Sequence, residues 1–232
     1  MNDGQTTKLT QPAWVTVLLF VVFPLLGAAL LQGINLAAGW LLSLPWVPFG
    51  GPLRLLDGAP EPAASIGALA AGAVLGLIIG AIGQWESLVV RLSGSDVTLT
   101  RKGETQTIPR TDIGSVFLDG KELVVLGRDT AELARVSASD LEPDRVEAGF
   151  RQHGYAWRDG DPHKGEFRRW VPELPELADA DHALLKARQR ALDKKDGSDA
   201  EELRRELAKL GVVVRDDKQT QHWRKIPRGL SR

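Results

Sequence analysis

Long apolar stretches without charge dominate the first third of the chain. Residues 14–44 contain no ionisable side chain, and neither do residues 63–83. A helix rises about 1.5 Å per residue, so roughly 20 apolar residues cross a hydrocarbon core about 30 Å thick. The pattern therefore predicts an α-helical hairpin over residues 13–85 that crosses a membrane twice, with spans at about 14–36 and 64–84.

The ends of the first span carry tryptophans. Trp14 lies at its start, and Trp40 and Trp46 follow its end, where membrane–water interfaces collect aromatic side chains. Pro24 is expected to kink this helix, which membrane helices tolerate. The apolar core of a cleavable signal peptide has only about 7–15 residues, so this longer stretch favours a retained helix.

The second span carries a regular row of glycines. Gly72, Gly76 and Gly80 recur every fourth residue and so share one helix face, where small side chains let two backbones approach closely. We expect this face to receive the first helix of the same chain. The alternative is that it joins two copies of the chain into a homo-oligomer.

Basic residues next to the spans predict the topology. Arg91, Arg101 and Lys102 follow the second span, and Lys8 precedes the first, whereas Arg54 is the basic residue of the connecting loop. The excess of basic residues on the cytoplasmic side of membrane proteins places both termini, including a tail over residues 1–12, in the cytoplasm. Neither span contains a charged residue to carry an ion or a proton, so a transporter is not expected.

The middle of the chain alternates apolar and polar positions in short runs. These runs fill residues 88–136 and are separated by turn pairs such as Asp119-Gly120, a strong hairpin signal because such turns need positive φ. Residues 140–154 then follow as one helix that ends near Gly154. A strand meander closed by a C-terminal helix predicts a pleckstrin-homology-like (PH-like) α+β half-barrel over residues 86–157.

This layout resembles a known family. Two spans, then Glu86-Ser-Leu-Val-Val, then a meander ending in Ser137-Ala-Ser-Asp-Leu, resemble the YqeB family of bacterial membrane proteins. The resemblance implies a multi-pass protein of the bacterial inner membrane with a cytoplasmic PH-like domain and no known catalysis. Residues 86–157 hold nine basic and twelve acidic side chains, a balance that disfavours capture of anionic lipid by this domain.

The last third predicts a small helical module with a short β-pair. A turn-rich linker covers residues 158–178, and a helix is expected from Asp181 to Lys194. Ser198 and Glu201 have the spacing of a capping box that opens a second helix, which Gly211 ends. Residues 212–214 and 221–225 then follow as two strands that could pair.

This C-terminal part, residues 179–232, is similar to the anticodon-binding module of bacterial cysteinyl-tRNA synthetases. It departs from that pattern at Gly197 and at Thr220-Gln221, and the catalytic motifs of the synthetase are absent. The resemblance implies a borrowed module with a tRNA or protein partner. It rests on Lys195-Asp196, Leu203-Arg204, Leu207, Gly211-Val212, Asp216 and Trp223-Arg224.

The similarity marks candidate RNA-binding residues. A base could stack on Trp223, while Arg204, Arg224 and Lys225 hold phosphates and Asp216 completes the motif. The competing interpretation has Trp223 packing on the leucine faces of the two helices. Residues 158–232 hold eighteen basic and fifteen acidic side chains, a weak excess for RNA binding that favours this second interpretation.

Residues suited to catalysis are missing. The chain has no cysteine, and its four histidines are dispersed without the spacing of a metal site. We therefore expect no catalytic residue, metal, cofactor or small-molecule ligand. The sequence predicts a non-catalytic inner-membrane protein. It would present a PH-like binding or scaffold domain and a C-terminal interaction module to the cytoplasm. The alternatives are a membrane-tethered protein that binds tRNA anticodon loops, and a structural protein that oligomerises through its glycine-rich helix.

Overall fold

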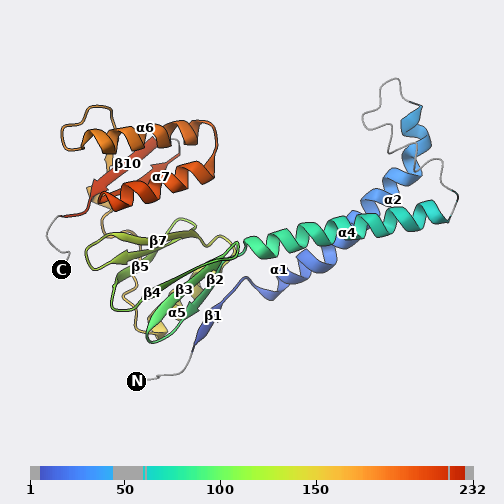
Figure 1. Ribbon diagram of the computed structural model, residues 1–232. Helices are drawn as coiled ribbons and strands as arrows, with labels where there is room; N and C mark the ends of the chain where they lie inside the picture. Colours follow the sequence, from blue (N-terminus) through green and yellow to red (C-terminus); the bar gives the residue numbers. More distant parts are fainter. Residues whose placement is uncertain (1–5, 44–59, 61, 219, 228–232) are drawn as a thin grey trace. The chain divides into compact units, whose positions relative to one another are not determined.

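The computed structural model describes residues 6–43, 60, 62–218 and 220–227 (Figure 1). The chain forms two compact units. One consists of Thr10–Val89 with Leu99–Thr105, and the other of Met1–Leu9, Val90–Thr98 and Gln106–Arg232. Trp46 and Arg54, which entered the sequence argument above, lie outside the described residues.

The first unit is built around two apolar helices. The first runs through α1 (Ala13–Val17), a π-helical turn η1 (Leu18–Val22) and α2 (Phe23–Leu42). The π turn directly precedes the turn that contains Pro24, and proline has no N–H to donate to the carbonyl one turn earlier. The second helix is α4 (Ala63–Glu86). Both are long and apolar enough to cross a membrane, judged by length and composition.

Glycines bring these helices into backbone contact. A Cβ atom added to Gly76 would lie 2.3 Å from the carbonyl oxygen of Phe23, and one added to Gly72 would lie 2.2 Å from that of Gly27. A Cβ atom at Gly80 would lie 2.3 Å from the carbonyl oxygen of Leu19. The glycine face of α4 is therefore occupied by the first helix of the same chain.

Two antiparallel sheets and a helix form the PH-like part. The first sheet has the order β1 (Thr7–Leu9), β2 (Val89–Leu92), β3 (Asp96–Arg101), β4 (Glu104–Pro109). The second has the order β5 (Ile113–Asp119), β6 (Glu122–Gly127), β7 (Glu132–Ser137), and α5 (Pro143–Gln152) follows it. Gly120, with φ of +62°, makes the β5–β6 turn as predicted.

Strand β1 comes from a segment that the sequence analysis treated as a tail. It pairs with β2, with Thr7 opposite Leu92 and Leu9 opposite Val90. Leu9 is buried. Three residues are too few to show an alternating pattern, so the strand became visible only through its tertiary partner.

The C-terminal module packs two helices on a three-stranded sheet. The helices are α6 (Asp179–Asp193) and α7 (Gly197–Lys209), and the sheet has the order β8 (Arg168–Arg169), β10 (Thr220–Lys225), β9 (Val212–Asp217). The predicted β-pair is present as β9 and β10. A short 3₁₀ turn, η2 (Lys164–Glu166), precedes β8, and both lie in the segment predicted to be a linker. The fold class predicted from the sequence is confirmed.

The predicted capping box at Ser198 is wrong. The N-cap residue of α7 is Asp196, whose Oδ1 accepts a hydrogen bond of 3.1 Å from the Asp199 backbone N–H. The Ser198 hydroxyl donates to the same Oδ1 at 2.8 Å. The Asp196 carboxylate therefore takes the capping role that the sequence assigned to Ser198. The helix begins two residues earlier than predicted.

Candidate nucleic-acid interface

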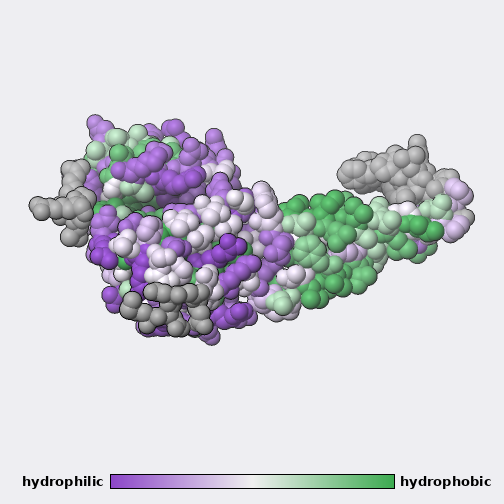
Figure 2. All heavy atoms as spheres, turned by 60° about the horizontal axis from the view of Figure 1, so that its bottom comes forward, coloured by the Kyte–Doolittle hydropathy of each residue, from purple (hydrophilic) through white to green (hydrophobic). Residues whose placement is uncertain are grey.

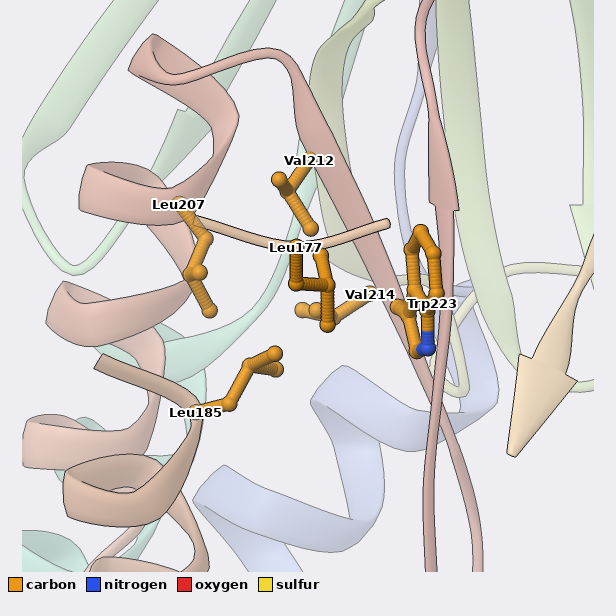
Figure 3. Close-up of a cluster of buried hydrophobic side chains, with 6 residues drawn as sticks. All are labelled: Leu177, Leu185, Leu207, Val212, Val214 and Trp223. Atoms are coloured by element: carbon orange, nitrogen blue, oxygen red, sulfur yellow. The ribbon is translucent and has the colours of Figure 1, made fainter. Parts of the chain in front are cut away.

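Trp223, the residue expected to stack on a base, lies in the core of the C-terminal module. Only 4% of its surface is exposed. Its Nε1 atom has no hydrogen-bond partner among the described residues. Figure 3 shows the indole ring facing apolar side chains from both helices and the neighbouring strand; the cluster consists of Leu177, Leu185, Leu207, Val212, Val214 and Trp223. A base can stack only on an accessible ring face, so this indole stabilises the fold.

Arg204 is committed to carboxylates. It lies on α7, where its guanidinium donates to Glu201, one turn earlier, at 2.6 and 2.9 Å. It also pairs with Glu132 of β7, in the PH-like part of the same compact unit. Burial lowers the pKa of Arg204, while the charges of Glu122 and Asp216 act in the opposite direction. The side chain is buried and therefore not available to a phosphate.

Arg224 is also buried and bonded within the chain. Its Nη2 donates to the Thr130 carbonyl at 2.7 Å and its Nη1 to the Thr130 hydroxyl at 3.3 Å. The guanidinium lies 5.5 Å from the centre of the Phe167 ring. Burial is the main cause of a lowered pKa for Arg224. Both predicted phosphate-binding arginines therefore connect the module to the β7 region of the sheet.

Asp216 accepts a bidentate ion pair from a residue that the sequence analysis did not identify. Arg188 of α6 donates to both of its carboxylate oxygens at 2.7 Å. The same guanidinium donates to the Gln221 side chain at 2.9 Å and to the Ala200 carbonyl at 3.1 Å. One signal could have identified Arg188, because it falls three residues after Leu185 on the apolar face of α6.

Lys225 alone among the five candidates combines an exposed side chain with a basic charge. Its ammonium lies 3.5 Å from a carboxylate oxygen of Asp181. Other exposed basic residues include Lys186 and Arg190 on α6 and Lys194 at its C-cap. The structure therefore buries three of the five predicted residues, Arg204, Trp223 and Arg224, whereas Asp216 and Lys225 are exposed.

A polar cavity of about 410 Å³ lies beside Arg204. Arg135 of β7 donates to Asp119 at 3.1 Å, to Glu122 at 2.6 Å and to Glu132 at 2.9 Å, and Arg215 of β9 donates to Asp119 at 2.9 Å. Acids and arginines alternate around it, so the charges are paired within the chain. The cavity is lined by Asp119, Gly120, Glu122, Arg135, Arg188, Glu201, Arg204, Val214, Arg215 and Asp216.

His163 has partners of its own near the acidic turn that precedes η2. Its backbone N–H donates to Asp161 Oδ1 at 2.8 Å, and its ring Nδ1 lies 2.7 Å from Glu166 Oε1. Among the described residues, no group of three or more His, Cys, Asp or Glu side chains is placed to hold a metal ion.

Comparison with known proteins then decides the family. Residues 7–158 match the family model described as the YqeB-like bacterial PH domain. The chain belongs to this YqeB-like family. The uncharacterised protein YqeB of Bacillus subtilis (strain 168) is 42% identical over 208 residues, which cover 89% of this chain and 86% of that protein. No solved structure matches the chain significantly.

The YqeB-like match begins at β1 and runs through both apolar helices and the two sheets. A second match covers residues 174–224, to the cysteinyl-tRNA ligase anticodon binding domain. Both resemblances inferred from the sequence are thereby confirmed. The second match spans α6, α7, β9 and most of β10, and so contains both the buried arginines and Trp223.

Proposed function

We propose that this YqeB-like protein is a non-catalytic scaffold anchored in the bacterial inner membrane by its helical hairpin. The PH-like sheets and the C-terminal module form the part outside the bilayer, and both termini lie in the cytoplasm. The buried arginines and Trp223 serve the fold of this part.

The outward surface of the hairpin carries the proposal. The two helices bury glycine and alanine against each other, whereas their large apolar side chains point outward, as at Leu25 (65% exposed) and Ile66 (63% exposed). Figure 2 shows the hydrophobic surface as a continuous band over this hairpin. Covering one such side chain is worth about 1.5–3 kcal/mol, and a bilayer would cover all of them.

The charge distribution supports the orientation. Lys8 precedes the first helix, and Arg91, Arg101 and Lys102 follow the second. Basic residues flanking membrane helices are retained on the cytoplasmic side. Both ends of the hairpin therefore favour the same side.

The test uses the full-length protein in bacterial cells. Because the chain has no cysteine, Lys121→Cys in the β5–β6 turn provides a single labelling site. We expect the protein to stay with membranes after extraction at pH 11, and a membrane-impermeant maleimide to label position 121 only after lysis. Release at high pH would overturn the anchor, and labelling of intact spheroplasts would overturn the orientation.

RNA binding is the second candidate, and the match of residues 174–224 to an anticodon-binding domain favours it. Since Trp223 and the two arginines are buried, an RNA would have to use exposed basic residues such as Lys186, Arg190 and Lys194. Photocrosslinking of full-length protein to total tRNA at low salt tests this, with the triple change of these residues to Glu. Capture that the triple variant loses would establish RNA binding, and no capture at low salt would exclude it, because phosphate contacts are strongest there.

A further inference from the structure

The tip of the β3–β4 hairpin is fastened to the last turn of α4. The Lys102 backbone N–H donates to the Trp85 carbonyl at 3.2 Å, and Arg101 Nε donates to the Glu86 carbonyl at 3.0 Å. The Lys102 ammonium lies 3.0 Å from Glu86 Oε1. Residues 99–105 accordingly belong to the same compact unit as the two apolar helices.

The length of α4 fixes the depth of this tip. Its 24 residues rise about 36 Å, whereas the hydrocarbon core is about 30 Å thick. The last residues of a spanning α4 therefore emerge among the lipid headgroups. Trp85, 61% exposed, lies at this level, which is where interfacial tryptophans collect.

We propose that the β3–β4 tip, residues 101–104, is a lipid-contact site in which Arg101 and Lys102 bind headgroup phosphates beside Trp85. The inference rests on the membrane anchor proposed above. Guanidinium and ammonium groups donate several charge-assisted hydrogen bonds to phosphate oxygens. At headgroup depth, the phosphates of surrounding lipids supply these acceptors.

The acidic balance of residues 86–157 does not oppose this site. That balance argues against recruitment of a soluble domain to an anionic surface, whereas here α4 delivers the tip to the headgroups. The Lys102–Glu86 pair has side chains that are 52% and 47% exposed. An exposed pair of this kind contributes little, so the Lys102 ammonium can exchange Glu86 for a lipid phosphate.

Spin labels in reconstituted full-length protein test the depth. Single cysteines replace Glu104 at the tip, Val74 in the middle of α4 and Lys121 in the β5–β6 turn, in vesicles of phosphatidylcholine with phosphatidylglycerol. Collision rates with oxygen and with a water-soluble nickel chelate report the depth of each nitroxide. We expect Val74→Cys in the hydrocarbon, Glu104→Cys at headgroup depth and Lys121→Cys in water.

Two failures are distinguishable. If Val74→Cys lies in hydrocarbon while Glu104→Cys matches Lys121→Cys, the lipid-contact site is overturned and the anchor stands. If Val74→Cys is in water, the anchor fails and the site with it.

The phosphate contact has a separate readout. In solid-state NMR of protein carrying ¹⁵Nζ-lysine, lipid ³¹P should dephase part of the lysine signal. Lys102→Gln should remove a component that Lys121→Gln leaves intact. Equal dephasing in both variants would overturn the role of Lys102.

Discussion

The Arg188 guanidinium donates to both carboxylate oxygens of Asp216 at 2.7 Å, and thereby ties α6 to β9. The arginine is 3% exposed, and it also donates to Ala200 and Gln221. Asp216, a motif residue predicted to contact RNA, is thus bound by a buried arginine of the same module. Four hydrogen bonds from one buried guanidinium hold the neighbouring elements in one arrangement.

Loss of Arg188 should destabilise the module. Arg188→Ala leaves the Gln221 side chain and the Ala200 carbonyl without this donor in the interior, and we expect a loss of about 1–3 kcal/mol in the free energy of unfolding. Urea titration of the full-length protein in detergent measures it. Arg190→Ala, at an exposed position of the same helix, is the matched control and should stay within about 0.5 kcal/mol of the parent. Equal stability of the two variants would contradict the network.

Trp223→Ala should destabilise the fold of the C-terminal module. Removing the buried indole from the apolar cluster that contains Leu185 and Leu207 should lower the free energy of unfolding by about 3–5 kcal/mol. Trp223→Phe, which keeps an aromatic ring, should lower it less. Chemical denaturation gives both values, and a tRNA crosslinking assay on the same samples separates the two roles. If Trp223→Ala kept its stability and lost RNA capture, Trp223 would be an RNA-binding residue and not a core residue.

The close contact between the two apolar helices at Gly76 predicts that a larger side chain at this position is destabilising. Gly76→Ala places a methyl group 2.3 Å from the Phe23 carbonyl oxygen, so the helices must separate. We expect a cost of about 1–3 kcal/mol, seen as a lower melting temperature in detergent micelles. Gly67→Ala is the control, because nothing lies within 4 Å of its added Cβ atom. A large effect on dimer crosslinking with an unchanged melting temperature would favour contact between two chains.

The N-cap residue of α7, Asp196, predicts that the stability of the protein depends on pH. The Asp199 backbone N–H, and then the Ser198 hydroxyl, lower the pKa of Asp196. A lowered pKa in the folded state gives stability that is present above the unfolded value of about 4 and is lost as the pH falls through the folded value.

Asp196→Asn keeps a capping oxygen without a titrating group. Melting temperatures of both proteins should therefore differ by a constant amount above about pH 5, and the parent should lose stability relative to the variant below about pH 4. Parallel curves down to pH 2 would contradict the capping role of the carboxylate.

Local patterns in the sequence predicted most of the elements. Charge-free stretches identified both apolar helices, and the turn glycines Gly120 and Gly211, with φ of +62° and +76°, marked where a strand and a helix end. These features depend on neighbours within a few residues, so a linear reading detects them. Strands β1 and β8 were missed because two or three residues carry no period and form only against a partner distant in sequence.

The sequence by itself determined the kinds of elements, their order and the families they resemble, because hydrophobic period and turn chemistry are local properties. Only the tertiary structure decided the roles of Trp223, Arg204, Arg224 and Asp216. An arginine can hold a phosphate or a buried carboxylate, and only its burial and its partners distinguish the two. Those partners, Glu132, Thr130 and Arg188, lie 28 to 94 residues away, and folding brings them together.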